Sequence, residues 1–480
     1  MVLGSGLAGL VAGALLTKKG HSVLLLRERG YQPSYATKGY HFVPFSNFSE
    51  KCFRYRFLRK ISQGMNFPFL MDPKEESNQT RIIPEKSKER ATFQVILPKA
   101  RVDIFPQRSV SQMEWKREFP EEVAQIGEFY NELDQIQPLF QKVNRSKNSV
   151  SFFPFRQRSF IKNIFSFGSF PKVRVDEKLS PFSNHFRKFI QLQLISWGNL
   201  YSDQFPISLA AHILSEETNE FNPNFDKEKL EREILDQFLK SGGRIEEIDR
   251  VKNVNPEWRK GITLLGEGDP RVFRSKIFIY NSPLHRISSL QGKKGRELSK
   301  WGEKIKPLYV MIPLFLGVRE KVIPVGMKDF LISILDLEKP YHDANVLFFS
   351  LSPKGDETKA PEGRRALIVE SLSPLSKWEQ TPFIDFQRAV MGHLNHLFPF
   401  LEDHIEFIDF QWASEQVPKW SYPHFAYEAT SDFDWRDGVV PVRVSKNIYF
   451  VGKENFPYLG LEGEILSGFM AAQQILKKSS

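Results

Sequence analysis

Apolar and polar positions at the start of the chain follow the order of a strand, a helix and a second strand. Met1 to Leu3 form a short apolar run before a glycine-rich turn, consistent with a start codon assigned too far downstream. The run from Leu10 to Lys19 is rich in small apolar residues and predicts a helix that ends at Gly20. The letters HSVLLL that follow are apolar and predict a buried strand ending by Glu28.

Later stretches predict a second group of strands. The letters FQVILPKARVDIF form two alternating runs around a Pro-Lys-Ala turn, which predicts a hairpin at 93–105 and the start of an inserted domain. Residues 113–142 have amphipathic spacing and predict a helix. A further strand is expected at 308–318, and NVLFFSL with RRALIVES predicts another pair around a long polar turn.

The remaining patterns predict a second helix and strand of the first unit and its last part. After Asn222 an amphipathic helix ends at Gly242 and Gly243 and leads into a strand. The apolar run SKIFIY ends at Asn281, and KNIYFVG near the C-terminus predicts a strand that continues through a glycine turn into a terminal helix. A helix that enters from such a turn points its N-terminal amides at an anion or an electron-rich ligand.

Composition limits the class of protein. A chain of 480 residues with 41% hydrophobic and 26% charged residues is expected to fold into two or three globular units. No apolar run reaches the roughly 18 to 20 residues of a membrane-spanning helix. The single cysteine, Cys52, allows neither an internal disulfide nor a cysteine-rich metal site, which indicates a reducing, cytoplasmic compartment.

Charge and aromatic content raise the question of a surface partner. The net charge of +10 favours anionic partners, but no nucleic-acid-binding motif is present, so we expect no nucleic acid. Many of the 43 phenylalanines crowd the region from Phe152 to Phe189. In residues 152–172 they alternate with arginines and lysines, which favours either packing within a domain or contact with a membrane surface.

The opening turn carries the strongest chemical signal. Gly4, Gly6 and Gly9 occupy the GxGxxG positions, where glycine permits a tight turn, close approach of a pyrophosphate, and close packing of the helix on the strand. Because a strand precedes and a helix and second strand follow, we interpret this turn as a dinucleotide site. Ser5, Leu7 and Ala8 complete the predicted phosphate-binding loop.

The end of the second strand departs from this fingerprint. Folds of this kind keep an acid there, which accepts hydrogen bonds from the ribose hydroxyls, but this chain has Arg27. Glu28 can replace the acid only if the strand ends or bulges there, because neighbouring strand residues point to opposite faces. Arg27 would instead suit a 2′-phosphate, as in NADP.

Together these motifs resemble the phytoene desaturase, carotenoid isomerase and retinol saturase branch of the flavin amine oxidase superfamily. The resemblance rests on the glycine fingerprint, the helix, SGG and strand at 230–254, FIYNSP at 278–283, SLSPKGDETKAPEG at 350–363, and the closing FVG to LSGFMAAQQIL. It implies an α/β fold in which an FAD/NAD(P)-binding Rossmann-like domain of the glutathione-reductase type carries an inserted α+β substrate domain. The expected FAD-binding parts are 1–75, 206–290 and 426–480, and the expected substrate-domain parts are 76–205 and 291–425.

The resemblance also implies the rest of the cofactor site. We expect Val251 near the adenine and His41 near the flavin ring or in an ordinary loop. The closing turn adds Gly452, Lys453, Glu454, Glu462, Gly463, Glu464 and Ile465. Lys453 replaces an acid of the family and would meet the pyrophosphate directly. The paired glycines of the family are replaced by GYQPSYATKGYHF.

Three alternative functions are consistent with these patterns. The first is an FAD-dependent oxidoreductase that acts by hydride transfer on carbon–carbon bonds of a hydrophobic, isoprenoid or polyene-like substrate. The second is a degenerate relative that binds NADP or no flavin, and the third is a basic lipid-binding scaffold. No catalytic residue can be named, since a flavin supplies the electron transfer itself. His393 and His396 lack supporting carboxylates at useful spacing, so we expect no metal.

Overall fold

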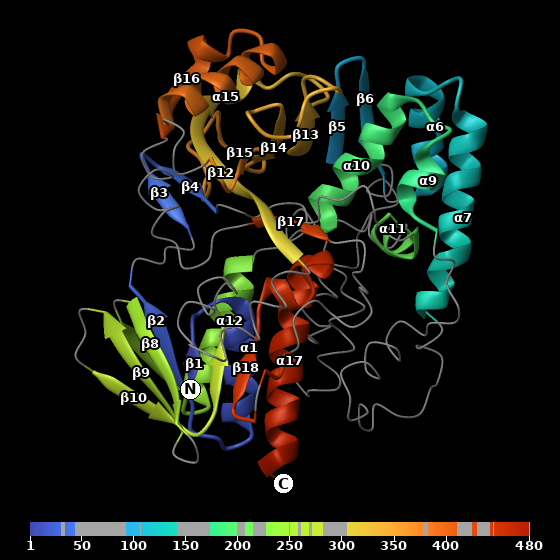
Figure 1. Cartoon of the computed structure of the whole chain (residues 1–480). Helices are drawn as coiled ribbons and strands as arrows, with labels where there is room; N and C mark the ends of the chain where they lie inside the picture. Colours follow the sequence, from blue (N-terminus) through green and yellow to red (C-terminus); the bar gives the residue numbers. More distant parts are fainter. Residues whose placement is uncertain are drawn as a thin grey trace.

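A computed structural model gives the arrangement of the chain (Figure 1). It describes residues 1–29, 34–43, 93–105, 107–141, 173–198, 207–214, 227–248, 250–257, 261–267, 271–281, 305–377, 383–409, 425–429, 442–444 and 446–479.

A five-stranded parallel sheet forms the centre of the first unit. Its strand order is β18-β11-β1-β2-β7, and every neighbouring pair is parallel. The three strands β18, β11 and β1 are buried along their whole length, as their apolar sequences predict. The strands are β1 (Val2–Leu3), β2 (Leu24–Glu28), β7 (Arg244–Ile248), β11 (Phe278–Tyr280) and β18 (Ile448–Phe450).

Three helices accompany this sheet. Helix α1 (Leu7–Lys18) is buried at every position except Lys18, and it packs against α12 (Lys227–Lys240) and α17 (Gly460–Ser479). Beside them lies a three-stranded antiparallel sheet of β8 (Arg250–Glu257), β9 (Gly261–Glu267) and β10 (Val272–Ser275). This parallel sheet with its crossover helices confirms the expected α/β fold class.

The second unit is built on a mixed sheet of eight strands. The order is β16-β12-β15-β14-β13-β5-β6, with β17 also paired to β12, and only β13 and β5 run parallel. The predicted hairpin at 93–105 and the predicted strands around 308–318 and 345–371 all belong to it. Its strands are β5 (Phe93–Leu97), β6 (Ala100–Ile104), β12 (Ile305–Arg319), β13 (Phe330–Ile334), β14 (Val346–Leu351), β15 (Arg364–Pro374), β16 (Ile405–Asp409) and β17 (Phe425–Ala429).

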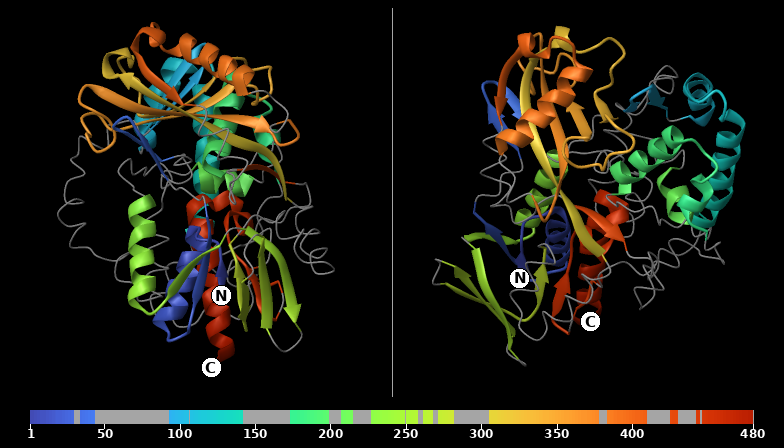
Figure 2. Two further views of the ribbon diagram at one scale, coloured as in Figure 1. Left: turned by 90° about the vertical axis from the view of Figure 1, so that its left-hand side faces the viewer. Right: turned by 45° about the horizontal axis from the view of Figure 1, so that its top comes forward.

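A short hairpin and six helices complete the described part of this unit. The hairpin of β3 (Tyr35–Thr37) and β4 (Tyr40–Phe42) lies against the large sheet, where the rings of Phe42 and Phe315 are 4.9 Å apart. Figure 2 shows the large sheet beyond the N-terminal end of α17, with the parallel sheet alongside that helix. The helices are α6 (Arg108–Glu118), α7 (Val123–Gln141), α9 (Val175–Leu179), α10 (Asn184–Gly198), α11 (Ile207–Ile213) and α15 (Phe383–Leu397).

The helical structure expected at 113–142 is confirmed, but a break divides it. The chain forms α6 and α7, separated at residues 119–122. Pro120 has no N–H to donate and disfavours the helical conformation of the residue before it, and Phe119 accordingly has φ −133° and ψ 55°. Amphipathic spacing continues across the break, so periodicity alone hides it.

Two other expectations remain predictions. Helix α11 lies in the stretch assigned to the FAD-binding domain but packs against α7, α9 and α10, and the domain boundaries stay predictions. The phenylalanine-rich segment 152–172 lies outside the described residues, so membrane contact there also stays a prediction. In the part of the chain that the structure describes, no helix is long and apolar enough to cross a bilayer.

Candidate functional site

The carboxyl ends of three parallel strands bring the predicted site together. Strands β1, β11 and β18 are neighbours in the sheet and end at Leu3, Tyr280 and Phe450. The glycine loop, Asn281 and the closing turn therefore leave the sheet at the same edge. This edge, where strands of an open parallel sheet end, is the usual place for a ligand in such folds.

The glycine loop makes the tight turn that its sequence predicts. Gly4 has φ +97°, which favours glycine, and its N–H donates to Leu26 O at 2.9 Å. A Cβ on Gly9 would lie only 2.9 Å from Gly4 O. Leu10 N–H donates to Gly6 O at 3.1 Å, which is a hydrogen bond within the helix. The N–H groups before Leu10 have no carbonyl one helical turn earlier that could accept from them. This end of α1 suits an anion.

Asn281 connects the three strand ends. Its Oδ1 accepts a hydrogen bond from Gly9 N–H at 2.9 Å, and its Nδ2 donates to Val451 O at 3.2 Å. A Cβ on either Gly6 or Gly9 would lie 2.7 Å from Asn281 Oδ1. The two glycines therefore leave room for this side chain, in addition to any role toward a pyrophosphate. Sequence reasoning did not select Asn281, although a polar residue directly after a buried parallel strand was a usable signal.

The closing turn is fixed by its own hydrogen bonds. Gly452 has φ +150°, and its N–H donates to Ser467 Oγ at 3.0 Å. The Ser467 hydroxyl in turn donates to Glu464 O at 2.7 Å, which ties the turn to the first part of α17. Gly463 is required for packing, since a Cβ there would lie 2.3 Å from Phe456 O.

Helix α17 packs closely on α1 at a glycine that sequence reasoning also missed. A Cβ on Gly468 would lie 2.2 Å from Ala8 O. Ala8 is in the first turn of α1, inside the predicted phosphate-binding loop. Gly468 therefore sets the spacing between the two helix starts that face the site. The run of small residues in SGFMAA was the available signal for such a close helix contact.

Arg27 and Glu28 lie in strand β2, which runs through both without a bulge. The register pairs Arg27 with Glu247 and Glu28 with Ile248. The two side chains therefore point to opposite faces. Strand β2 ends at Glu28, so the replacement of the missing acid by Glu28 stays a prediction. Arg27 is half-buried, and its Nε atom is enclosed with no hydrogen-bond partner. This donor would suit an anionic ligand.

The predicted residues of the closing turn lie together and are mostly buried. Lys453 and Glu454 belong to a short 3-10 turn (Lys453–Asn455) directly after Gly452, and Glu454 is buried. Glu462, Gly463, Glu464 and Ile465 form the start of α17 and are buried. The Glu464 side chain is only 6% exposed, and its Oε2 has no hydrogen-bond partner.

These features test whether a dinucleotide fits. A buried carboxylate oxygen without a donor is costly, so a ligand hydroxyl group that donates to Oε2 would stabilise Glu464. The start of α1, in which Gly9 N–H is already bonded to Asn281, and the N-terminus of α17 suit a pyrophosphate and an electron-rich ring. The groups present therefore match the acceptors and donors of FAD.

Val251 and His41 are the remaining positions predicted to lie near the cofactor. Val251 lies on β8 and pairs with Gly266 in the three-stranded sheet, next to the end of β7. His41 lies in strand β4, so the expectation of an ordinary loop histidine is wrong. The backbone N–H of His41 donates to Lys359 O at 2.9 Å. In its side chain, Nδ1 is 3.1 Å from Lys359 Nζ and Nε2 is 3.8 Å from Oε2 of Glu228 in α12.

His393 is enclosed in the second unit and acts in packing. Its Nδ1 donates to Ala344 O at 2.7 Å, and its Nε2 accepts from the Ser333 hydroxyl at 2.9 Å. Burial lowers the pKa of His393 from 6.5 to about 4. Among the described residues no group of three or more His, Cys, Asp or Glu could hold a metal ion. Absence of a metal stays a prediction for the whole chain.

The low pKa of His393 predicts acid sensitivity. The imidazole is neutral when folded, so between pH 6.5 and about 4 the unfolded chain binds the extra proton. The stabilisation is complete above pH 6.5 and falls by about 3 kcal/mol as the pH approaches 4. We expect urea unfolding at pH 7 and pH 5 to show a smaller difference for His393→Gln than for the wild type. The exposed His396→Gln is the control, and an equal pH response of all three proteins would contradict the assignment.

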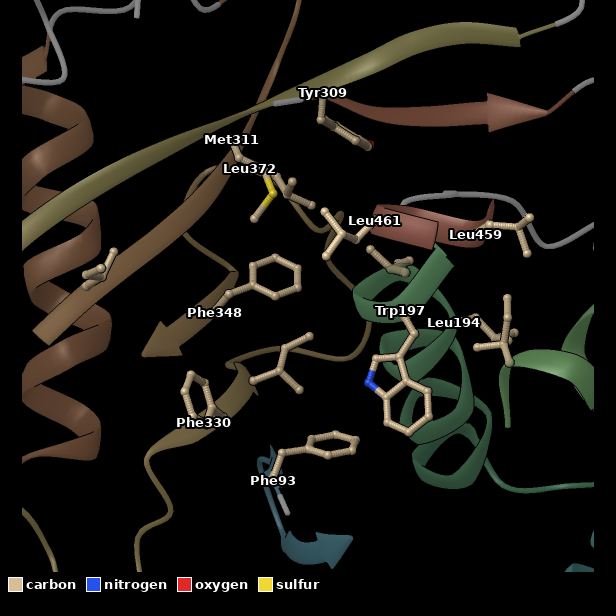
Figure 3. Close-up of a cluster of buried hydrophobic side chains, with 14 of the residues drawn as sticks. Phe93, Leu194, Trp197, Tyr309, Met311, Phe330, Phe348, Leu372, Leu459 and Leu461 are labelled. Carbon is tan, nitrogen blue, oxygen red and sulfur yellow. The ribbon is translucent and has the colours of Figure 1, made fainter. Parts of the chain in front are cut away.

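An apolar cluster lies between the large sheet, helix α10 and the start of α17 (Figure 3). Met311, Phe348 and Leu372 come from the sheet, whereas Leu459 and Leu461 flank the start of α17. All five side chains are at most 8% exposed. The cluster therefore joins the second unit to the helix that carries Glu462 to Ile465.

Comparison with known proteins agrees with this arrangement. Residues 314–476 match the family of flavin containing amine oxidoreductases, and residues 2–42 match the NAD(P)-binding Rossmann-like domain. A stretch of 197 residues is 27% identical to a chloroplastic prolycopene isomerase of Arabidopsis thaliana. That match spans 37% of this chain and 32% of the relative, so the chain covers about a third of the relative's length.

Solved structures share the fold over nearly the whole chain. An oxidoreductase from Methanosarcina mazei superposes with a TM-score of 0.56 at 16% identity, covering 98% of this chain and 99% of that one. A triple mutant of putrescine oxidase gives 0.61 at 12% identity, covering 99% and 98%. Cyclohexylamine oxidase from Brevibacterium oxydans gives 0.55 at 13% identity, covering 100% and 98%.

These matches confirm the resemblance that the motifs indicate. The two family segments contain the glycine loop and the closing turn, which the structure brings together at one sheet edge. They support a flavin-dependent oxidoreductase with FAD as its cofactor, and the prolycopene isomerase match supports the carotenoid-type branch.

Proposed function

We propose that this flavin-containing oxidoreductase of the amine oxidase superfamily transfers hydride between FAD and a carbon–carbon bond of a hydrophobic, isoprenoid or polyene-like substrate. The observation that supports it most is the meeting of Asn281, the start of α1 and the start of α17 at one edge of the parallel sheet. When bound, the flavin supplies the electron-transfer chemistry. The apolar cluster beside α17 supports a hydrophobic substrate.

The residues have separate roles in this proposal. The N–H groups at the start of α1 bind the pyrophosphate, and Lys453 adds a positive charge close to it. Glu464 accepts a hydrogen bond from a hydroxyl group of the cofactor. Gly463 and Gly468 keep α17 close enough for its N-terminus to reach the cofactor. The apolar cluster excludes water from the reacting bond.

The experiment is to purify the protein and measure the flavin absorbance, before and after incubation with FAD and removal of the excess. A yellow protein with stoichiometric flavin supports the proposal. A colourless protein that takes up no flavin contradicts it and leaves the degenerate relative that binds NADP or no flavin and the lipid-binding scaffold. Hydride transfer is tested next, by reduction of bound flavin under anaerobic conditions with polyene substrates.

Glu464→Gln should change stability and cofactor affinity in opposite directions. The substitution removes a buried charge that has an unpartnered oxygen, so we expect the flavin-free protein to unfold at higher temperature. It also weakens the hydrogen bond to a cofactor hydroxyl, so FAD affinity should fall about tenfold. Thermal unfolding and FAD titration check both effects. A variant that binds FAD as tightly as the wild type would show that Glu464 does not contact the cofactor.

The enclosed Nε of Arg27 supports NADP as a second candidate ligand. A guanidinium that faces a 2′-phosphate would make binding depend on that phosphate. Arg27→Glu should then abolish NADP binding, whereas it should tighten FAD binding if Arg27 only replaces a ribose-binding acid. Titration of the variant with FAD, NADP and NAD distinguishes the two. Unchanged binding of all three would place Arg27 outside the site.

A further inference from the structure

We propose that the apolar cluster of Figure 3 binds a neutral oxygenated lipid, and that the indole N–H of Trp197 donates a hydrogen bond to the oxygen of that lipid. The inference rests on the proposed function because it places the substrate beside the start of α17. It narrows the substrate from any polyene to an isoprenoid alcohol, aldehyde or ketone.

Trp197 carries a hydrogen-bond donor that the protein itself does not use. The residue lies on α10 and is 5% exposed, and its Nε1 has no hydrogen-bond partner. Its ring packs on Phe93 with centroids 5.2 Å apart and planes at 59°. In Figure 3 the indole nitrogen faces the side chains that come from the strands, such as Phe348. An unpaired buried N–H opposes folding, whereas phenylalanine is also aromatic and apolar but carries no such donor.

The residues around Trp197 limit which ligand can accept a hydrogen bond from its indole N–H. The labelled neighbours Phe93, Phe330 and Phe348 are hydrocarbon side chains, and no charged residue is among the labelled members of the cluster. A carboxylate would lose its hydration there and gain only neutral donors, which is insufficient. A pure hydrocarbon would leave the N–H unpaired. A single neutral oxygen on an apolar chain satisfies both conditions.

The cluster also lies where such a ligand would meet the cofactor. Leu459 and Leu461 belong to the cluster and flank the turn into α17. The next residues, Glu462 to Ile465, are the predicted cofactor contacts. A chain held by Trp197 would therefore run from the large sheet toward the flavin site.

The test compares three ligands of one carbon skeleton. Geranylgeraniol, geranylgeranoic acid and the corresponding hydrocarbon are equilibrated by dialysis with purified flavin-containing protein, and bound ligand is quantified. We expect the wild type to bind the alcohol about tenfold more tightly than the hydrocarbon or the acid. Trp197→Phe should bind alcohol and hydrocarbon equally while unfolding at the same or a higher urea concentration. Trp115 of α6 is a buried tryptophan that stacks on Tyr130 of α7, and Trp115→Phe should keep the preference.

Several results would overturn the inference. Equal binding of alcohol and hydrocarbon by the wild type would do so, and so would an unchanged preference in Trp197→Phe. If that variant does not fold, the indole N–H proton of Trp197 in the wild type is followed by nuclear magnetic resonance, and it must shift downfield with the alcohol alone. Dialysis measures binding without turnover. A protein that binds the alcohol but shows no flavin chemistry would therefore contradict only the proposed function.

Discussion

Gly468→Ala is expected to lower the free energy of unfolding by about 3 kcal/mol and to weaken FAD binding by at least about a hundredfold. The added Cβ would lie 2.2 Å from Ala8 O, and a backbone atom in the first turn of a buried helix cannot move aside alone. The start of α17 must shift away from α1, which separates two helix N-termini that the cofactor is expected to contact together. Urea unfolding and FAD titration measure the two effects.

Gly392→Ala is the matched control. Gly392 is also inside a helix, α15, but a Cβ there meets no heavy atom within 4 Å. Alanine has the better helix propensity, so this variant should be more stable by about 0.5 to 1 kcal/mol, with unchanged FAD affinity. If both variants behaved alike, the close approach of the two helices would not hold in the protein.

Local sequence signals predicted the elements that depend on local structure. The glycine loop and the helix and strand after it follow from residues within one short segment, and the structure has them at α1 and β2. The same holds for the hairpin of β5 and β6, whose turn lies between its two strands. The break at Pro120 was the exception, because the apolar spacing continues across it and outweighed a single proline.

The contacts that define the site join residues far apart in the sequence, which is why pattern reasoning missed them. Gly9 and Asn281 are 272 positions apart, and Asn281 and Val451 are 170 apart. Gly468 is required because of a carbonyl at Ala8, and the unused donor of Trp197 is visible only once its neighbours are placed. A sequence shows that each residue is small, polar or aromatic, but the partner that gives it a role comes from the fold.

The same long-range contacts change the interpretation of the fingerprint glycines. Glycine at positions 6 and 9 is usually explained by the ligand, yet here a side chain at either would first meet Asn281. A substitution such as Gly6→Val would therefore disturb the protein as well as the ligand. Asn281 is the better probe, because it can be changed without adding volume to the loop.

Asn281→Asp is expected to be the most damaging isosteric change in the site. In the variant, Oδ1 can still accept from Gly9 N–H. In the wild type, Nδ2 donates to Val451 O at 3.2 Å, but the aspartate oxygen that replaces Nδ2 has no hydrogen to donate. The unpaired carbonyl and the buried charge together should lower the free energy of unfolding by about 3 kcal/mol. The charge would also repel a pyrophosphate at the start of α1, so FAD affinity should fall about a hundredfold or more.

Asn345→Asp is the control that separates the loss of stability from the loss of FAD affinity. Asn345 is also buried and its Nδ2 donates to the carbonyls of Asp336, Lys339 and Pro340, but these contacts lie in the second unit, away from the glycine loop. It should lose comparable stability under urea while its FAD affinity stays at the wild-type value. Acidification should partly restore FAD binding to Asn281→Asp, since a protonated carboxyl regains a donor for Val451 O and loses its charge. If both aspartate variants instead bind FAD as the wild type does, Asn281 serves only the fold, and the anion site must lie elsewhere on α1.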